Sequence, residues 1–589
     1  MMRKMLLSAL LASGLFAVGP AAFAQTSDEV RRLHAFFDAE WERRLEESPM
    51  AATYAGDNRA NDRWDDMSLA AIEARGAADR KALAELLAMD RGKLSAADQL
   101  SYDIKRWQLE NGIEAQKFRR HLIPLSQRGG VQSANETAEV IRFATTRDYR
   151  DWLARMRALP ALIDQNTALM REGIKAGVMP PKVLMQRISA QIDKQLVDDP
   201  TKSPFYATFE RFPDAIPAAE RTALAAEARK VIAGDIVPAY RKFATFFNDE
   251  YLPKARNSIA ASDGPDGQAY YAYTAKMHTT TDLTPQQIHD IGLKEVARIR
   301  AEMLKIKDEV GFKGDLKAFF MDLRSNPRFF CKTPEELFTA YQAISKRIDP
   351  ELVKVSKMIP RMPYGVRPIP MTTAADNTTA YYMGPAQDGS RPGYYYVNLY
   401  RPEVRPKWEM MALSLHEAVP GHHFQIARAQ ELGELPKFRR HGGFTAYIEG
   451  WGLYAERLGF DMGLYDDPYD RMGQLAYDMW RAVRLVVDTG MHAKGWSREQ
   501  AIGYFMNNSP KTEADITNEI DRYISWPGQA LAYKIGQLKI SELRARAERE
   551  LGPKFDIREF NDAVLDIGAV PLTVLEARMD AWIAARKRA

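Results

Sequence analysis

The sequence predicts a mostly α-helical protein with one small β element, and two observations predict this fold class. Apolar residues recur at helical spacing through most of the 589 residues. In "TPQQIHDIGLKEVARIRAEMLKIKDEVGF", Thr284 and Gln287 fit a capping box and Pro285 fits the first helical position. Only residues 360–402, rich in Pro, Gly, Thr and Tyr, depart from this pattern. With 46% apolar and 27% charged residues, the chain can bury a sizeable core.

The first 24 residues differ from the rest. "MMRK" is basic, and the apolar "MLLSALLASGLFAVGP" is too short and too interrupted to span a bilayer. "AFA" before Gln25 fits a small-x-small cleavage pattern. We expect residues 1–24 to be a secretory signal peptide rather than a retained anchor. No cysteine follows the apolar stretch, so the mature protein is expected in the periplasm or outside the cell, without a membrane anchor.

Charge and cysteine content exclude some partners. The formal charge is +4, and removing Arg3 and Lys4 with the signal peptide lowers it by two. Such a balance argues against nucleic acid as a partner. Cys331 is the sole cysteine, so the chain can form no internal disulfide and a packed core must hold it together.

Helices and breaks follow one another along the chain. "VMPPK" (178–182) and "ASDGPDGQAY" (261–270) are turn or linker signals. The second divides an N-terminal helical region, 25–260, from a second helical region, 261–589, although we expect one integrated unit. Before that division, helical periodicity covers residues 27–55, 64–118, 134–177 and 216–249.

Residues 360–402, which depart from the helical pattern, predict a β-hairpin. "AYYMGP" (380–385) and "GYYYVNLY" (393–400) have strand character, and the turn-like "AQDGSR" joins them. Helices resume at about residue 407. The hairpin therefore comes just before the densest histidine cluster of the chain.

That cluster is "HEAVPGHH", residues 416–423, which holds three of the nine histidines. Zinc peptidases carry His-Glu-x-x-His on a helix, where ligands four residues apart differ by about 40° in direction. His416 and His422 are six apart, about 120° and ~9 Å on a regular helix, too far for one metal ion. Surface histidines that bind metal only adventitiously are the alternative.

Pro420 and Gly421 can correct this spacing. Proline has no N–H for the carbonyl of residue 416, and glycine tolerates unusual backbone angles. A two-residue bulge would bring His422 to the place of the second ligand. His423 is the competing choice, and we otherwise expect it to contact substrate or support the site.

A third ligand is expected in "TAYIEGWGLYAERLGF". Glu449 lies 27 residues beyond His422, which leaves room for a loop and a returning helix. The alternative for Glu449 is a buried salt bridge to an arginine. Glu456, two turns further on the same face, would support a ligand or have a structural role.

Two further segments carry candidate residues. In "GQLAYDMWRAVRLVVDTGMHAKGW", a polar stripe includes Arg481, Arg484 (or Leu485), Asp488 and His492. An ordinary amphipathic surface helix explains it equally well. Otherwise either arginine could bind a substrate carboxylate, and Asp488 or His492 could orient a ligand or stabilise an oxyanion.

In "EIDRYISWPGQALAYKIG", Tyr523 and Tyr533 flank a break at Pro527-Gly528. A tyrosine hydroxyl directed at a developing oxyanion is a common need of zinc hydrolysis. Packing is the alternative for each tyrosine, and the two rank equally.

The chain resembles a known family at this point. "YYYVNLYRPEVRPKWEMMALSLHEAVPGHHFQ", "YIEGWGLYAERLG", "WRAVRLVVDTGMHAKGW" and "RYISWPGQALAYKIG" are similar to the bacterial family of domain of unknown function 885. Its members look like zinc-dependent peptidases, distantly similar to the thimet-oligopeptidase and carboxypeptidase Taq groups. The resemblance implies a large α-helical fold with a deep cleft. It also implies His416, His422 and Glu449 as ligands of one Zn²⁺ and Glu417 as general base.

The function expected from these residues is metal-assisted hydrolysis of peptide bonds in short peptides, near their C-terminus. Export makes peptides plausible substrates. Two alternatives stay open: a zinc-binding periplasmic protein without turnover, and a zinc amidase that acts on a non-peptide or cell-wall amide. The intact Glu417 argues against loss of turnover.

Overall fold

The computed structural model describes residues 28–588, apart from 128, 375–376, 387–388, 390 and 434 and the side chains of 372 and 373. The predicted signal peptide lies outside the described residues. Within them, no helix combines the length and the apolar character needed to cross a membrane.

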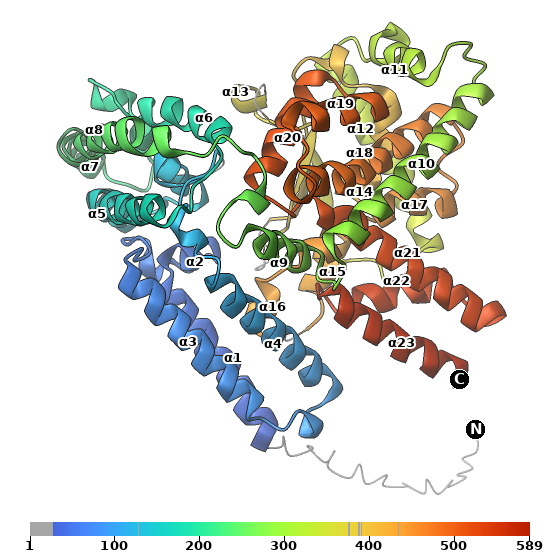
Figure 1. The fold of residues 1–589 in the computed structure, drawn as a ribbon, viewed down its shortest axis with the longest axis horizontal. Coiled ribbons are helices and arrows are strands. Elements are labelled where there is room, and N and C mark those ends of the chain that lie inside the picture. Colours follow the sequence, from blue (N-terminus) through green and yellow to red (C-terminus); the bar gives the residue numbers. More distant parts are fainter. Residues whose placement is uncertain are drawn as a thin grey trace, which may run out of the picture.

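The structure is mostly helical, as predicted (Figure 1). The helices before residue 261 are α1 (Asp28–Glu47), α2 (Pro49–Tyr54), α3 (Leu69–Leu87), α4 (Ala96–Gln116), α5 (Thr146–Ala176), α6 (Lys182–Asp193), α7 (Ala218–Val231) and α8 (Val237–Thr245). Those after it are α9 (Gly267–Thr279), α10 (Pro285–Glu309), α11 (Leu316–Ser325), α12 (Pro334–Ile348), α13 (Met371–Ala374), α14 (Met410–Glu417), α15 (His422–Gln430), α16 (Lys437–Arg440), α17 (Thr445–Met462), α18 (Pro468–Ala493), α19 (Arg498–Asn508), α20 (Glu513–Ser525), α21 (Leu531–Leu551), α22 (Ile557–Leu565) and α23 (Leu572–Arg588).

Local signals explain several helix ends. The capping box before α10 is present: Thr284 Oγ1 accepts from the Gln287 N–H at 3.2 Å, and Gln287 Oε1 accepts from the Thr284 N–H at 2.9 Å. The predicted helical stretch 64–118 is divided, because Ser95 caps a new helix, α4. The stretch 216–249 runs through two π-helical segments, Ile232–Ile236 and Phe246–Tyr251.

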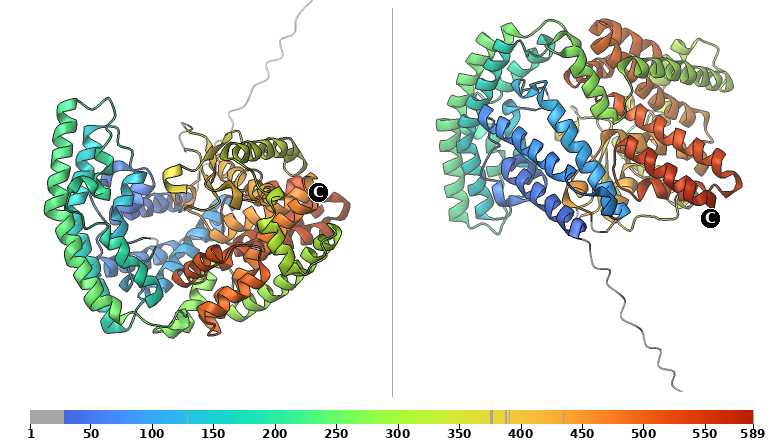
Figure 2. Two further views of the ribbon diagram at one scale, coloured as in Figure 1. Left: turned by 90° about the horizontal axis from the view of Figure 1, so that it is seen from above. Right: turned by 60° about the horizontal axis from the view of Figure 1, so that its bottom comes forward.

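Two hydrophobic cores join the two halves of the chain. One combines residues of α5–α8 with residues of α10, α11 and α18–α20, and the other combines α1, α3 and α4 with α17 and α21–α23. Figure 2 shows the N-terminal helices curving around to meet the C-terminal ones. The linker at 261–270 is therefore no boundary between cores. The expected deep cleft stays a prediction.

A three-stranded sheet lies beside the histidine cluster. The predicted hairpin is confirmed: β2 (Ala380–Met383) pairs antiparallel with β3 (Gly393–Val397), with Tyr381 opposite Tyr396. A third strand, β1 (Tyr364–Pro368), pairs parallel with β3 and gives the order β1-β3-β2. The pattern did not predict β1, because Pro363 directly precedes it and Pro368 is its last residue.

Helix α18 occupies the centre of the C-terminal half. It packs against α10 and α21 and is buried at nearly every position from Met472 to His492. An amphipathic surface helix, the alternative considered for this segment, is thus wrong. The polar residues of the stripe are inside the protein, where each needs a partner.

Candidate metal centre

His416 and His422 belong to two different helices. Helix α14 ends at Glu417 and α15 begins at His422, so residues 418–421 form a break rather than the expected bulge within one helix. Pro420 has no N–H to continue α14. Gly421 has φ −76° and ψ −129°, and a Cβ there would lie 1.9 Å from the carbonyl oxygen of His416. The break changes the helix direction and brings the two rings together.

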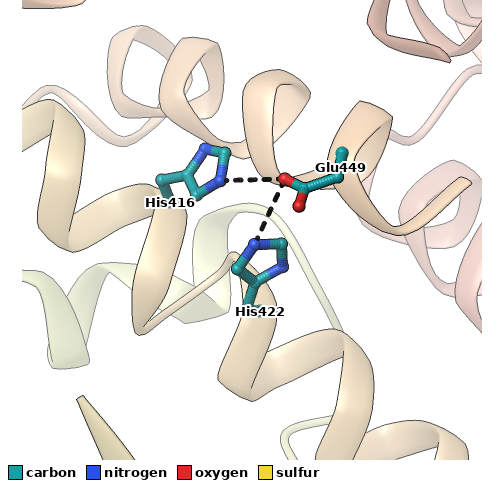
Figure 3. A group of neighbouring side chains, drawn as sticks. All are labelled: His416, His422 and Glu449. Carbon is teal, nitrogen blue, oxygen red and sulfur yellow. Dashed lines mark ion pairs between the residues drawn. The ribbon is translucent and has the colours of Figure 1, made fainter. Parts of the chain in front are cut away.

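The structure brings together His416, His422 and Glu449 (Figure 3). The Nε2 atoms of both histidines lie 3.5 Å from the same oxygen of Glu449, Oε2. The imidazole rings are nearly perpendicular, at 85°, with centroids 4.6 Å apart. One potential ligand atom from each residue lies within 4.8 Å of the others.

This spacing fits a zinc ion. Two ligand atoms at 2.0–2.1 Å from a tetrahedral zinc are about 3.4 Å apart. The two nitrogen–oxygen separations of 3.5 Å match that edge and exceed an ordinary hydrogen bond. His416 Nδ1 is bonded to Glu456 Oε1 at 2.8 Å, which directs Nε2 toward Glu449. Glu456 thus orients the His416 ring.

The charges of the cluster favour a cation. Burial lowers the pKa of His416, but Glu449, Glu456 and the nearby charge of Glu417 outweigh burial and raise it to about 9. Burial raises the pKa of Glu449, but the two histidines hold it well below its usual range. The carboxylate is therefore charged at neutral pH, as a metal ligand must be.

Helix α17 (Thr445–Met462) positions the break and the first ligand. Trp451 Nε1 donates to the carbonyl oxygen of Pro420 at 2.8 Å. Gly452 faces the His416 ring, where a Cβ would lie 2.7–3.1 Å from three ring atoms. A glycine is thus needed for the ring to pack this close to α17.

Glu417 is a free carboxylate next to the cluster. It is the last residue of α14 and is half-buried. Among the described residues, no hydrogen-bond or ion-pair partner of its side chain is found. A carboxylate in this position can exchange a proton with a molecule bound at the centre.

His423 lies outside the cluster. Its Nε2 donates to the carbonyl oxygen of Met362 at 3.0 Å, and its Nδ1 accepts from the Tyr382 hydroxyl at 2.8 Å. The ring is buried, and burial lowers its pKa to about 4. Because both nitrogens are occupied, His423 anchors the sheet to α15, and the expected substrate contact is not supported.

His492 and Tyr523 are also occupied. His492 is fully buried: its Nδ1 accepts from the Ala261 N–H and its Nε2 donates to the carbonyl oxygen of Tyr523, both at 3.0 Å. The Tyr523 hydroxyl accepts from Arg484 at 2.7 Å and donates to Glu519 at 2.6 Å. Neither has a hydrogen to offer an oxyanion, so both expectations are corrected to structural roles.

Tyr533 keeps a free donor. Its hydroxyl accepts from Arg522 Nη2 at 3.3 Å, and in the described structure it donates to no acceptor. Tyr533 is on α21, one turn before Gly536, where α21 crosses α17 so closely that a Cβ would lie 1.8 Å from the Ala446 carbonyl oxygen. This crossing is beside Glu449. Of the two tyrosines, Tyr533 is thus the one whose hydroxyl hydrogen is not taken up by a described acceptor.

The two arginines of α18 differ. Arg484 pairs with Glu519 at 2.9 Å and not with Asp488, which instead accepts from the Tyr271 hydroxyl and the Gly528 N–H. Arg481 is only 8% exposed, yet it has no ion pair among the described residues. It stacks on Tyr477 and donates to the Tyr477 carbonyl oxygen at 3.4 Å.

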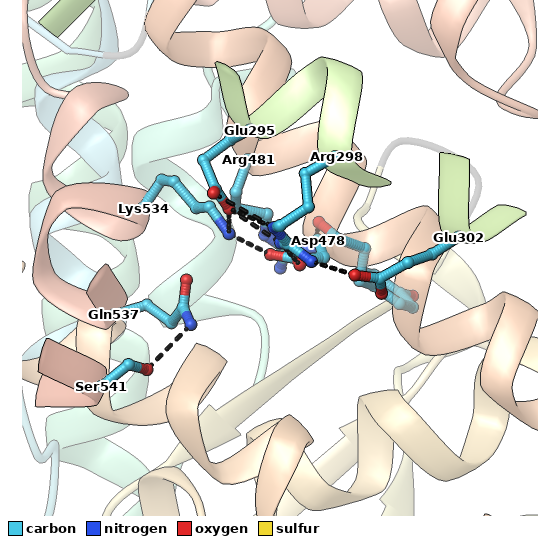
Figure 4. A network of polar contacts seen from close by, with 9 residues as sticks. Glu295, Arg298, Glu302, Asp478, Arg481, Lys534, Gln537 and Ser541 are labelled. Atoms are coloured by element: carbon cyan, nitrogen blue, oxygen red, sulfur yellow. Dashed lines mark hydrogen bonds and ion pairs between the residues drawn. The ribbon is translucent and has the colours of Figure 1, made fainter. Parts of the chain in front are cut away.

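A buried ion cluster beside Arg481 was not predicted (Figure 4). Lys534, fully buried, pairs with Asp478 and with Glu295 at 2.9 Å. Arg298 also pairs with Asp478, at 2.9 Å. The cluster ties α10, α18 and α21 together. Because the acids of this cluster already pair with Lys534 and Arg298, none of them neutralises Arg481.

The fold and the site together define the class of this protein: it is a helical protein with a His-His-Glu cluster at a helix break. Residues 49–579 match the family model described as bacterial protein of unknown function (DUF885), and the chain belongs to this family. No curated protein matches it.

Among the solved structures that are similar to this chain, two are described as lipoproteins. One is a candidate lipoprotein from Colwellia psychrerythraea, 28% identical, with a TM-score of 0.86 over 95% of this chain and 100% of that one. The other, a candidate lipoprotein of unknown function from Shewanella oneidensis, is 20% identical, with a TM-score of 0.75 over 94% and 100%. A candidate oligoendopeptidase F from Bacillus anthracis reaches a TM-score of only 0.25 at 10% identity over 86% and 96%, too low to show a shared fold.

Proposed function

We propose that the protein is an exported zinc-dependent peptidase that hydrolyses amide bonds of short peptides near their C-terminus. The observation that carries the proposal is the convergence of His416, His422 and Glu449 beside the unpaired carboxylate of Glu417. The signal-peptide pattern and the two structural relatives described as lipoproteins support export.

The residues have distinct roles in this proposal. His416, His422 and Glu449 would hold one zinc ion, which when bound supplies Lewis-acid chemistry for amide hydrolysis. Glu417 would take the proton from the attacking water and return it to the leaving amine. Tyr533 would donate its hydroxyl hydrogen to the developing oxyanion.

Arg481 supports the preference for a free C-terminus. A buried guanidinium without a counter-ion is costly, and Tyr477 supplies only a ring face and one long hydrogen bond. A substrate carboxylate would provide the missing charge through paired hydrogen bonds. Arg484 does not need a substrate carboxylate, because Glu519 already neutralises it.

The test is hydrolysis of a peptide library by the purified mature protein, with and without a chelator. We expect about one zinc per molecule and activity that the chelator abolishes. Glu417→Gln should keep the zinc and lose nearly all turnover. Zinc without hydrolysis of any peptide would favour the non-catalytic or non-peptide alternatives, and no zinc after reloading would reject the proposal.

Peptides with a free and an amidated C-terminus test Arg481. We expect kcat/KM to fall at least tenfold on amidation, about 1.4 kcal/mol, in the wild type but not in Arg481→Met. Equal rates on the two peptides in the wild type would remove the carboxylate contact and leave the hydrolase proposal standing.

A further inference from the structure

A cavity of about 170 Å³ lies along α15 (His422–Gln430) beyond His422. On an ideal helix, its wall residues Gln425, Ile426 and Ala429 lie within about 60° of the direction of His422, one to two turns further on. Ile448, the residue before Glu449, forms another wall. The cavity therefore lies along the side of α15 that carries His422, and the sequence neighbour of Glu449 lines it.

The cavity wall contains a buried amide without partners. Gln425 is only 3% exposed, and its Oε1 is buried with no hydrogen-bond partner. Its Nε2 likewise has no hydrogen bond within the described part of the chain. A buried polar group left unsatisfied costs about 1–3 kcal/mol, so an amide in such a place indicates a ligand that completes its hydrogen bonds.

The same wall contains a guanidinium without a counter-ion. Arg439 donates to the Ser101 hydroxyl at 3.3 Å and to the Ile567 carbonyl oxygen, while its Nε has no partner. No carboxylate of residues 28–588, as far as they are described, pairs with it. Burial lowers its pKa to about 10, so it stays charged at neutral pH. Arg440, also in the wall, adds a second positive charge.

We propose that this cavity is a substrate subsite for an acidic side chain, held by Gln425 and Arg439. The proposal rests on the proposed peptidase function and names a second determinant of its substrates. The volume suits one side chain, since a cavity of ~150 Å³ can hold benzene. An extended peptide advances about 3.3–3.6 Å per residue, so the subsite would take a residue one to three positions from the cleaved bond.

Binding to the zinc-loaded Glu417→Gln protein tests the subsite without turnover. The probes are alanine pentapeptides that carry one glutamate or one leucine at each position in turn, measured by calorimetry. At one position we expect the glutamate peptide to bind at least tenfold more tightly than the leucine peptide. In the same background, Gln425→Leu and Arg439→Lys should each reduce that preference at least fivefold.

Lys437→Met is the matched control, because Lys437 is on the same short helix as Arg439 but pairs with Glu42, at 3.4 Å. It should leave the preference unchanged. Melting curves identify any variant that fails to fold, and Gln425→Leu breaks no hydrogen bond seen in the described structure. Equal binding of both peptides, absence of binding, or an intact preference in folded Gln425→Leu would overturn the subsite. Failure of the peptidase proposal would appear separately, as absent hydrolysis by the wild type.

Discussion

Replacing Glu456 with glutamine tests whether the His416–Glu456 hydrogen bond supports metal binding. Glu456 is 1% exposed and accepts from His416 Nδ1 at 2.8 Å. Glutamine keeps an acceptor of the same shape but removes the negative charge that makes the ring a better ligand. Its NH₂ group would also occupy the place of Oε2, which has no partner among the described residues. Loss of such a supporting partner typically costs 10–100-fold in metal affinity, about 1.4–2.8 kcal/mol.

The assay is zinc affinity by competition with a chelator at neutral pH. Asp461→Asn is the matched control, since Asp461 is on the same helix as Glu456 but pairs with Arg544, at 2.8 Å. We expect the dissociation constant for zinc to rise 10–100-fold in Glu456→Gln and to stay within about twofold in the control. An unchanged constant in Glu456→Gln, or an equal loss in Asp461→Asn, would refute the reasoning.

Three further predictions follow from the packing of single residues. Gly452→Ala should weaken zinc binding at least tenfold, because its Cβ would lie 2.7–3.1 Å from the His416 ring; metal analysis that shows normal affinity would contradict this. His423→Ala should retain about one zinc per molecule and melt at a lower temperature, whereas loss of zinc would make His423 a ligand. Burial raises the pKa of Asp488 to about 7, so the folded state holds this proton more tightly than the unfolded chain, in which the pKa is about 3.9. The free energy of unfolding should thus lose a contribution of roughly 4 kcal/mol as the pH rises from 4 to 8. Denaturation curves of Asp488→Asn should show a weaker dependence of this free energy on pH than those of the wild type. An identical dependence in the two proteins would refute the prediction.

Local patterns determined the parts of the fold that depend on near neighbours. The capping box at Thr284 and the β2–β3 hairpin are short-range features, and both are confirmed. The sequence also predicted that His416, His422 and Glu449 come together: Pro420 and Gly421 mark the break that brings in His422, and the spacing to Glu449 allows a returning helix. The sequence did not predict that the break separates two helices, since a bulge within one helix satisfies the same spacing.

Tertiary packing alone decided which polar residues remain available. The sequence by itself placed Arg481 and Arg484 on one stripe and ranked Tyr523 and Tyr533 equally. In the fold, Glu519 neutralises Arg484 and occupies Tyr523, whereas Arg481 and Tyr533 keep unused hydrogen-bond donors. Helix periodicity tells which face a side chain occupies, but hydrogen-bond partners come from helices distant in the sequence. Their identity, and hence the chemistry left free at the site, is determined only when those helices pack.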